Sequence, residues 1–357
     1  MRPALRSLRR AERLYAWLAV LLCLAMLAGR SVGAADDGLQ GSFSATLVSP
    51  SSSGIVALAA DALPVSAATG DPGAAKKTAD TDLLPAALPS WIQPAPERTA
   101  AEDIPGPTKV RDISPGLVSA DYAIVIDGAS GKVLWARDAN TPVPPASITK
   151  IVTALVVLDH ARITDLVTVG VDSQVMIEDS VMGLSPGEVL TVEDLLYGMM
   201  LPSGNDAALA LADYVGGTRE AFARLMNEKA HSLGLTGSSF VNPHGRDAFG
   251  HLTTAYDMAM LAREGMRSPI FQRLASARSY ETPRGRGYQM GNLNQLLWRY
   301  PGADGVKIGY DDAAGKTIVG SAVRDGHRVY VAMMRSADIF SDSRALLDWT
   351  FASYDWS

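Results

Sequence analysis

Short apolar runs near residue 122 and again after residue 300 have the length and the flanking turn residues of β-strands. The run YAIVID is separated from KVLWA by Gly128-Ala-Ser-Gly131, and Asp325-Gly326 separates two of the later runs, as in hairpin turns. The predicted strands are Tyr122–Asp127, Lys132–Ala136, Gly305–Tyr310, Thr317–Arg324 and Arg328–Met334.

Between these two groups of strands, apolar positions recur at helical spacing. The predicted helices include Val192–Met200, Asp206–Val215 and Thr218–Leu233, and a last helix covers about Ser341–Ser353. Strands at both ends with helices between them predict an α+β fold. In such a fold one mostly antiparallel sheet is built from both ends of the domain and packs beside a helical region.

The N-terminal part of the chain has a different composition. Basic residues precede an uninterrupted apolar run of sixteen residues from Leu14 to Gly29, and Val32-Gly33-Ala34 offers a cleavage site. We expect 1–34 to be a signal peptide, or a signal anchor that tethers the protein to the membrane. Residues 35–112, rich in Ala, Pro and Ser, are predicted to be a disordered linker, which leaves 113–357 as the folded domain.

Charge and cysteine content narrow the possible partners. The chain has 32 Lys and Arg against 38 Asp and Glu, and no basic cluster that a nucleic acid would need. The only cysteine, Cys23, lies in the predicted signal, so the mature protein has no disulfide or thiolate site. The five histidines show no metal-ligand spacing, and we expect no metal and no cofactor.

One charged residue stands out on an apolar helix. Lys150 is the only charged residue from Ser147 to Leu158, and it lies three residues after that serine, on the same face of the first turn. Burial lowers the pKa of an ammonium group and favours the neutral amine. A neutral amine beside a hydroxyl is a general base beside a nucleophile, although a snorkelling lysine beside a capping serine would give the same spacing.

Two further motifs remove this ambiguity. The sequence LPSGNDAA places Ser203-Gly204-Asn205 between two predicted helices, and DGVKIGY places Lys307-Ile308-Gly309 at the end of a predicted strand. Ser-x-x-Lys, Ser-x-Asn and Lys-Thr-Gly in this order are the signature of penicillin-binding proteins and class A β-lactamases.

With PPASITK, FVNPHG and ADGVKIGYDDAAGKT, the chain resembles the serine-type D-alanyl-D-alanine carboxypeptidases, which are low-molecular-mass penicillin-binding proteins, over roughly residues 113–355. The resemblance implies a β-lactamase/transpeptidase-like fold with a five-stranded sheet. It also implies an extracytoplasmic enzyme, secreted, periplasmic or on the cell-wall side of the membrane. The implied partners are peptidoglycan stem peptides ending in D-Ala-D-Ala, with β-lactams as inhibitors.

The resemblance also implies three catalytic residues. Ser147 would be the nucleophile, Lys150 its base, and Ser203 the relay that protonates the departing D-alanine.

The remaining motif residues would bind the substrate. Asn205 would hold the substrate amide, Lys307 the terminal carboxylate, and Gly309 belongs to the same strand. The backbone N–H groups of Ser147 and Tyr310 would form an oxyanion hole. His244 is interpreted as a turn residue, and Asp206 as a residue that suits the helix dipole.

Two positions depart from the pattern of the resembled family. Ile308 and Asp311 stand where threonines are usual, so a hydroxyl for the terminal carboxylate is missing and an acidic group lies nearby. The sequence therefore leaves open the efficiency of catalysis.

Three other functions fit the same motifs. A serine β-lactamase is disfavoured because Glu178, Glu188 and Glu193 precede the second motif rather than follow it. An endopeptidase would have the same sequence features. A weakly active or inactive relative that binds cell-wall peptide is favoured only by Ile308 and Asp311.

Overall fold

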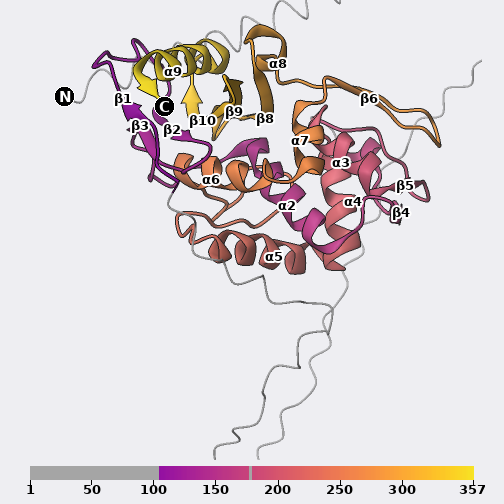
Figure 1. Cartoon of the computed structure of the whole chain (residues 1–357). Coiled ribbons are helices and arrows are strands. Elements are labelled where there is room, and N and C mark those ends of the chain that lie inside the picture. The colour runs from indigo at the N-terminus through magenta and orange to yellow at the C-terminus, as the bar shows by residue number, and fades with distance from the viewer. Residues whose placement is uncertain (1–103, 177–178) are drawn as a thin grey trace, which may run out of the picture. The chain divides into compact units, whose positions relative to one another are not determined.

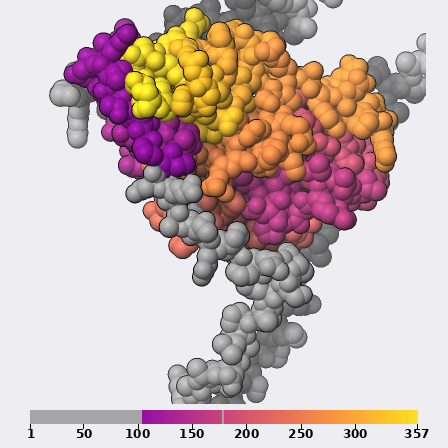
Figure 2. Space-filling model, in the orientation of Figure 1, coloured from indigo at the N-terminus to yellow at the C-terminus, as the bar shows by residue number. Residues whose placement is uncertain are grey.

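The computed structural model describes residues 104–176 and 179–357. The predicted signal and most of the predicted linker therefore lie outside the described residues. Part of the predicted linker before residue 113 belongs to the fold, since β1 (Thr108–Lys109) pairs with β11 (Tyr354–Asp355). Figure 2 shows the resulting neighbourhood of indigo and yellow residues on the surface.

A five-stranded sheet is built from the two ends of this region, and every pair in it is antiparallel (Figure 1). Its order is β3-β2-β10-β9-β8, so the N-terminal pair β2 and β3 joins the C-terminal strands through the contact of β2 with β10. The strands are β2 (Tyr122–Asp127), β3 (Val133–Arg137), β8 (Ala303–Asp311), β9 (Gly315–Arg324) and β10 (His327–Ser336). This confirms the predicted fold class.

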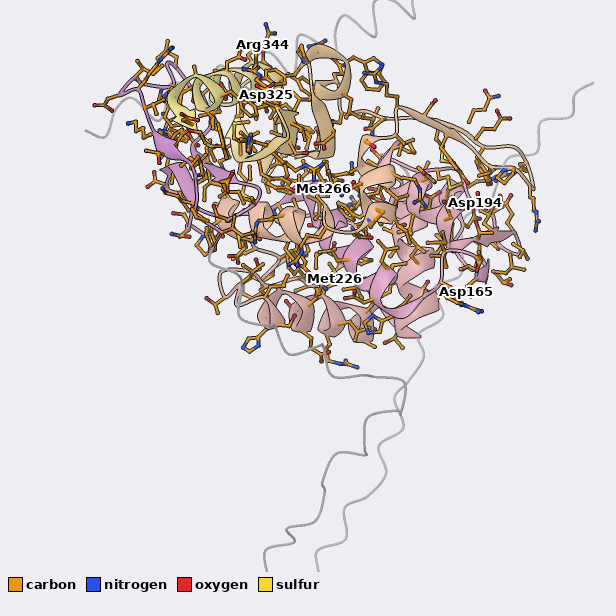
Figure 3. All side chains as sticks on the ribbon, viewed as in Figure 1. Asp165, Asp194, Met226, Met266, Asp325 and Arg344 are labelled. Atoms are coloured by element: carbon orange, nitrogen blue, oxygen red, sulfur yellow. The ribbon has the colours of Figure 1, made fainter. Side chains whose placement is uncertain are left out.

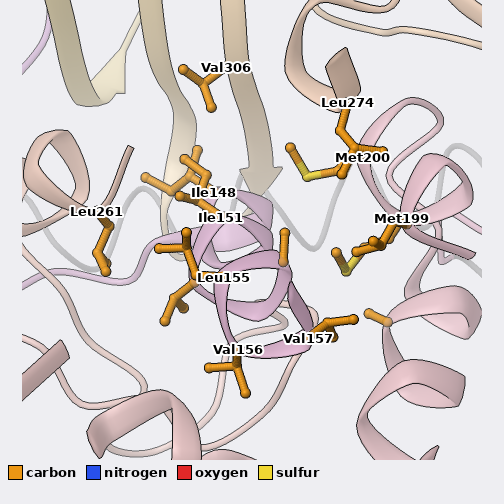
Figure 4. Packing of buried hydrophobic residues seen from close by; sticks show 14 of the residues in the cluster. Ile148, Ile151, Leu155, Val156, Val157, Met199, Met200, Leu261, Leu274 and Val306 are labelled. Atoms are coloured by element: carbon orange, nitrogen blue, oxygen red, sulfur yellow. The ribbon is translucent and has the colours of Figure 1, made fainter. Parts of the chain in front are cut away.

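Helices cover both faces of the sheet. The larger hydrophobic cluster lies on the side of α2 (Lys150–His160), where Ile148 and Ile151 lie toward the strands and Leu155 lies further along the helix (Figure 4). A smaller cluster lies under the last helix, α9, through Leu346 and Leu347. The helices are α2 (Lys150–His160), α3 (Val192–Met200), α4 (Asn205–Gly216), α5 (Arg219–Ser232), α6 (Ala255–Gly265), α7 (Pro269–Ser276), α8 (Leu296–Arg299) and α9 (Ile339–Ser353).

Local sequence signals explain several helix ends. Thr191 accepts from the N–H of Asp194, whose carboxylate accepts in return from Thr191, so α3 begins with a capping box. Asp194 is labelled in Figure 3, on the helical side of the molecule. Gly217, at φ +69°, ends α4 in a left-handed conformation that glycine adopts without strain.

Shorter elements complete the fold. There are two 3-10 turns, η1 (Ala146–Thr149) and η2 (Ser173–Val175). Two small antiparallel sheets pair β4 (Leu166–Thr168) with β5 (Val189–Thr191), and β6 (Ser279–Glu281) with β7 (Gln289–Gly291). Among the described residues, no helix has the length and apolar character that crossing a membrane requires.

Candidate active site

The start of α2 separates the candidate nucleophile from the candidate base. Ser147 lies on the 3-10 turn η1 and is partly exposed, whereas Lys150 is the first residue of α2 and is fully buried. The predicted helix from Ser147 therefore begins as a tighter turn. This turn places the hydroxyl at the surface of the site while the lysine points into it.

The amine of Lys150 has three hydrogen-bond partners. It lies 2.6 Å from Oδ1 of Asn205, 2.8 Å from the carbonyl oxygen of His244 and 2.9 Å from Oγ of Ser147. The first two partners can only accept, so they take two N–H groups. A neutral amine has two N–H groups and one lone pair, which leaves the lone pair for the hydroxyl proton of Ser147. The ammonium form would donate to all three partners, but they also accommodate the neutral form, in which Ser147 donates to the lone pair.

Electrostatics favour the same form. Burial, followed by the positive charge of Lys307, holds the pKa of Lys150 well below its usual range, against the opposite effect of Asp179 and Asp206. Burial also lowers the pKa of Lys307 to about 7. Two buried ammonium groups in one site are costly, so the protonation of one disfavours that of the other.

The second motif lies between α3 and α4 with a strained backbone. Ser203 is buried and has φ +66°, a left-handed conformation that is uncommon outside glycine. Asn205 begins α4, and its N–H donates to the carbonyl of Ser180 at 2.7 Å. The turn thus directs the Asn205 side chain toward Lys150.

The third motif lies on β8, packed against η1. An added Cβ at Gly309 would lie 2.6 Å from the backbone nitrogen of Ser147, so only glycine allows the strand to come this close. Thr317 on β9 donates to the carbonyl of Pro145 at 3.0 Å and fixes the same approach. Tyr310 follows Gly309 and is largely exposed.

Not all predicted residues are joined by contacts. The structure links Ser147, Lys150 and Asn205 directly and sets Gly309 against Ser147. Within the described part of the chain, the side chain of Lys307 has one hydrogen bond, to the carbonyl of Ile308 at 3.2 Å.

The two departures from the motif have structural roles of their own. Ile308 is half-buried and packs against the smaller hydrophobic cluster. Asp311 accepts from the N–H of Ala314 at 2.7 Å, which closes the turn between β8 and β9.

Asp206 has a larger structural role than its position at a helix start predicts. Its buried carboxylate accepts from the N–H groups of Met182, Gly183 and Leu184 at 2.8–3.0 Å, and from that of Ala207. It therefore anchors the 182–184 loop beside the second motif, beyond any effect on the helix dipole. The sequence feature that could indicate this role is an acidic residue at the start of a helix that is otherwise almost entirely apolar.

His244 is a turn residue, as interpreted from the sequence. Its Nδ1 accepts from the N–H of Arg246, and its carbonyl binds Lys150. Burial, followed by the charge of Lys150, lowers the pKa of its imidazole to about 3. Across residues 104–176 and 179–357, no cluster of His, Cys, Asp and Glu could hold a metal ion.

Comparisons with a family model and with individual known proteins agree on one family. A model described as D-alanyl-D-alanine carboxypeptidase matches residues 109–338. The chain is 41% identical over 239 residues to D-alanyl-D-alanine carboxypeptidase DacB2 of Mycobacterium tuberculosis, which covers 64% of this chain and 81% of that protein. It is 39% identical over 252 residues to D-alanyl-D-alanine carboxypeptidase DacC of Escherichia coli, covering 67% of this chain but only 62% of that protein.

Solved structures agree in fold. A D-alanyl-D-alanine carboxypeptidase from Mycobacterium tuberculosis aligns with a TM-score of 0.65 at 36% identity, covering 69% of this chain and 96% of that one. The Streptomyces K15 DD-transpeptidase aligns with a TM-score of 0.63 at 31% identity, covering 67% of this chain and all of that one (100%).

Proposed function

Since the chain belongs to the D-alanyl-D-alanine carboxypeptidase family, we propose that it is an exported serine hydrolase that removes the terminal D-alanine from peptidoglycan stem peptides. The observation that carries this proposal is the set of partners around the amine of Lys150. Two carbonyl-type acceptors and one hydroxyl suit a neutral base that faces a nucleophile.

Acylation follows from this arrangement. Oγ of Ser147 attacks the carbonyl carbon of the penultimate D-alanine while its proton passes to Nζ of Lys150. The backbone N–H groups of Ser147 and Tyr310 stabilise the oxyanion. When the tetrahedral intermediate collapses, the C–N bond breaks, and the leaving amine receives a proton from Lys150 through the hydroxyl of Ser203. The products are a serine ester of the shortened peptide and free D-alanine.

Deacylation returns the enzyme to its starting state. Water attacks the ester carbon, Lys150 takes the proton from the water, and the Ser147 oxygen leaves and is reprotonated. β-Lactams imitate the D-Ala-D-Ala end and acylate the same serine, but their ester hydrolyses slowly.

Lys307 and Asn205 orient the substrate. The ammonium of Lys307 binds the terminal carboxylate, and the side chain of Asn205 holds the substrate amide. Gly309 lets β8 lie beside the substrate. The substrate resides in the cell wall, so the N-terminal 1–34 segment serves for export, cleaved as a signal or retained as a membrane tether.

An intact-mass time course with benzylpenicillin tests the proposal on the full chain. The expected result is a persistent adduct that is absent from Ser147→Ala, together with D-alanine release from a stem peptide ending in D-Ala-D-Ala. An adduct without D-alanine release would favour a penicillin-binding relative that only holds cell-wall peptide. Rapid turnover of the drug would favour a β-lactamase, and absence of any adduct would refute the acyl-enzyme.

A further inference from the structure

A buried histidine outside the three motifs is connected to the turn that carries Ser147. His251 is fully buried, and its Nδ1 accepts from the N–H of Val241 at 3.0 Å. The ring proton of a neutral imidazole is therefore on Nε2. Nε2 lies 2.9 Å from Oγ1 of Thr149, so it donates to this hydroxyl.

The hydroxyl of Thr149 passes this constraint on to the residue before the nucleophile. It donates to the carbonyl of Ala146 at 2.9 Å. On the other side, the backbone at Gly245 is so close that an added Cβ would lie 2.0 Å from the same carbonyl oxygen. The Ala146 carbonyl is thus enclosed between Thr149 and the 242–251 loop.

Ala146 needs such support. Its φ is +51°, in the left-handed region that non-glycine residues adopt only where the surroundings impose it. If this residue relaxed to an ordinary conformation, the direction of the next peptide would change. That peptide contains the N–H of Ser147 and ends at the Cα that bears its side chain. The N–H group and the hydroxyl would therefore both leave their positions relative to Lys150 and β8.

We propose that His251 is a positioning residue that acts through Thr149 to hold Ala146 left-handed and so to aim Ser147. This inference rests on the proposed function, because it assigns a role in delivering that serine. His251 does not transfer protons in the reaction, since both ring nitrogens are already engaged. Burial lowers the pKa of the ring to about 4, so it stays neutral at the working pH.

The test compares two threonines of the same buried surface. Thr149→Val removes the hydroxyl that holds Ala146. Thr153→Val removes a buried hydroxyl one turn later, which donates to the carbonyl of Pro243 in the same loop but does not reach Ala146. Thr149→Val loses the bonds to His251 and Ala146, and Thr153→Val loses the bond to Pro243, so denaturant unfolding first measures how much stability each variant loses. Only Thr149→Val should slow acylation by benzylpenicillin, by about 10- to 100-fold, whereas Thr153→Val should stay within about twofold of the parent.

Conservative variants of Thr149 and His251 provide a second test of the positioning role. Thr149→Ser keeps the hydroxyl and should restore acylation. The side-chain amide of His251→Gln reaches the position of Nε2, where it can donate to Thr149, whereas that of His251→Asn reaches only the position of Nδ1. The Gln variant should therefore be acylated by benzylpenicillin faster than the Asn variant. This comparison holds even where Thr149→Val fails to fold. The acylation rate constant, rather than the apparent affinity for the drug, should carry the difference.

The outcomes separate the two proposals. If the unaltered chain forms no adduct at Ser147, the proposed function fails. If it does form one and Thr149→Val acylates at the parental rate, only the positioning role is overturned. Equal slowing in Thr149→Val and Thr153→Val would also overturn it, because acylation would then follow stability alone.

Discussion

Placing a charge beside Lys150 should move the pH dependence of catalysis in a direction that the structure fixes. In Asn205→Asp, a carboxylate replaces the amide oxygen that lies 2.6 Å from the lysine amine. Coulomb's law gives about 6 kcal/mol for unit charges at this distance with an effective dielectric constant of about 20. Desolvation of the buried carboxylate offsets several kcal/mol of this attraction. About 1.5–3 kcal/mol in favour of the ammonium form should remain.

The loss of neutral base should appear as a rate effect. At neutral pH, 1.5–3 kcal/mol corresponds to a roughly 10- to 100-fold decrease in kcat/KM for D-alanine release. Because the substitution raises the pKa of Lys150, the acid limb of the kcat/KM profile should move to higher pH and activity should recover there. Asn205→Ala removes the same amide without adding charge, so it should lower the profile at all pH values without this movement.

A substitution of opposite sign provides the control. Asp179 raises the pKa of Lys150, and its carboxylate lies 3.2 Å from the guanidinium of Arg246. Asp179→Asn should therefore move the acid limb to lower pH. Acid limbs that stay in place in both Asn205→Asp and Asp179→Asn would show that Lys150 is not the group that titrates, and the assignment of the base would be wrong.

Three further outcomes are expected. Burial lowers the pKa of Lys307 to about 7 in the folded state, so the unfolded chain binds more protons above that pH and the free energy of unfolding should rise between about pH 7 and 10; Lys307→Met should make this slope shallower in denaturant unfolding, and the part that comes from the lowered pKa of Lys150 should remain. Ile308→Thr should raise kcat/KM for D-alanine release by about 10-fold or more through a bond to the terminal carboxylate, with a stability loss of about 1 kcal/mol from reduced packing. Asp206→Asn should cost about 2–4 kcal/mol in denaturant unfolding, because its amide group faces the N–H groups of the 182–184 loop.

The sequence predicted the elements that carry strong local signals. Tyr122–Asp127 and Val192–Met200 match β2 and α3 at both ends, since a turn follows the first run and a capping threonine precedes the second. The two-residue strand β1 has no periodicity to detect and exists only because β11 lies beside it. The motif residues could be proposed from the sequence because their chemistry requires fixed residue types.

The backbone strain of the site could not be predicted in the same way. Ala146 and Ser203 are ordinary residues in sequence, and nothing next to them indicates a positive φ. Their conformations are imposed by distant segments, such as Gly245 against the Ala146 carbonyl. The anchoring role of Asp206 was not predicted for a similar reason, because three of its four donors lie 22–24 residues earlier in the chain.

The roles proposed for the two buried lysines of the site differ because their hydrogen-bond partners differ. Lys150 has two obligate acceptors and one hydroxyl, so its neutral form satisfies every group around it. Lys307, in the described structure, has a single carbonyl partner and retains N–H groups for a substrate. A pKa of about 7 leaves its protonation sensitive to what binds, and an arriving carboxylate would stabilise its charge. That charge would in turn keep Lys150 neutral, so binding of the anionic end of the peptide would itself prepare the base that accepts the proton of Ser147.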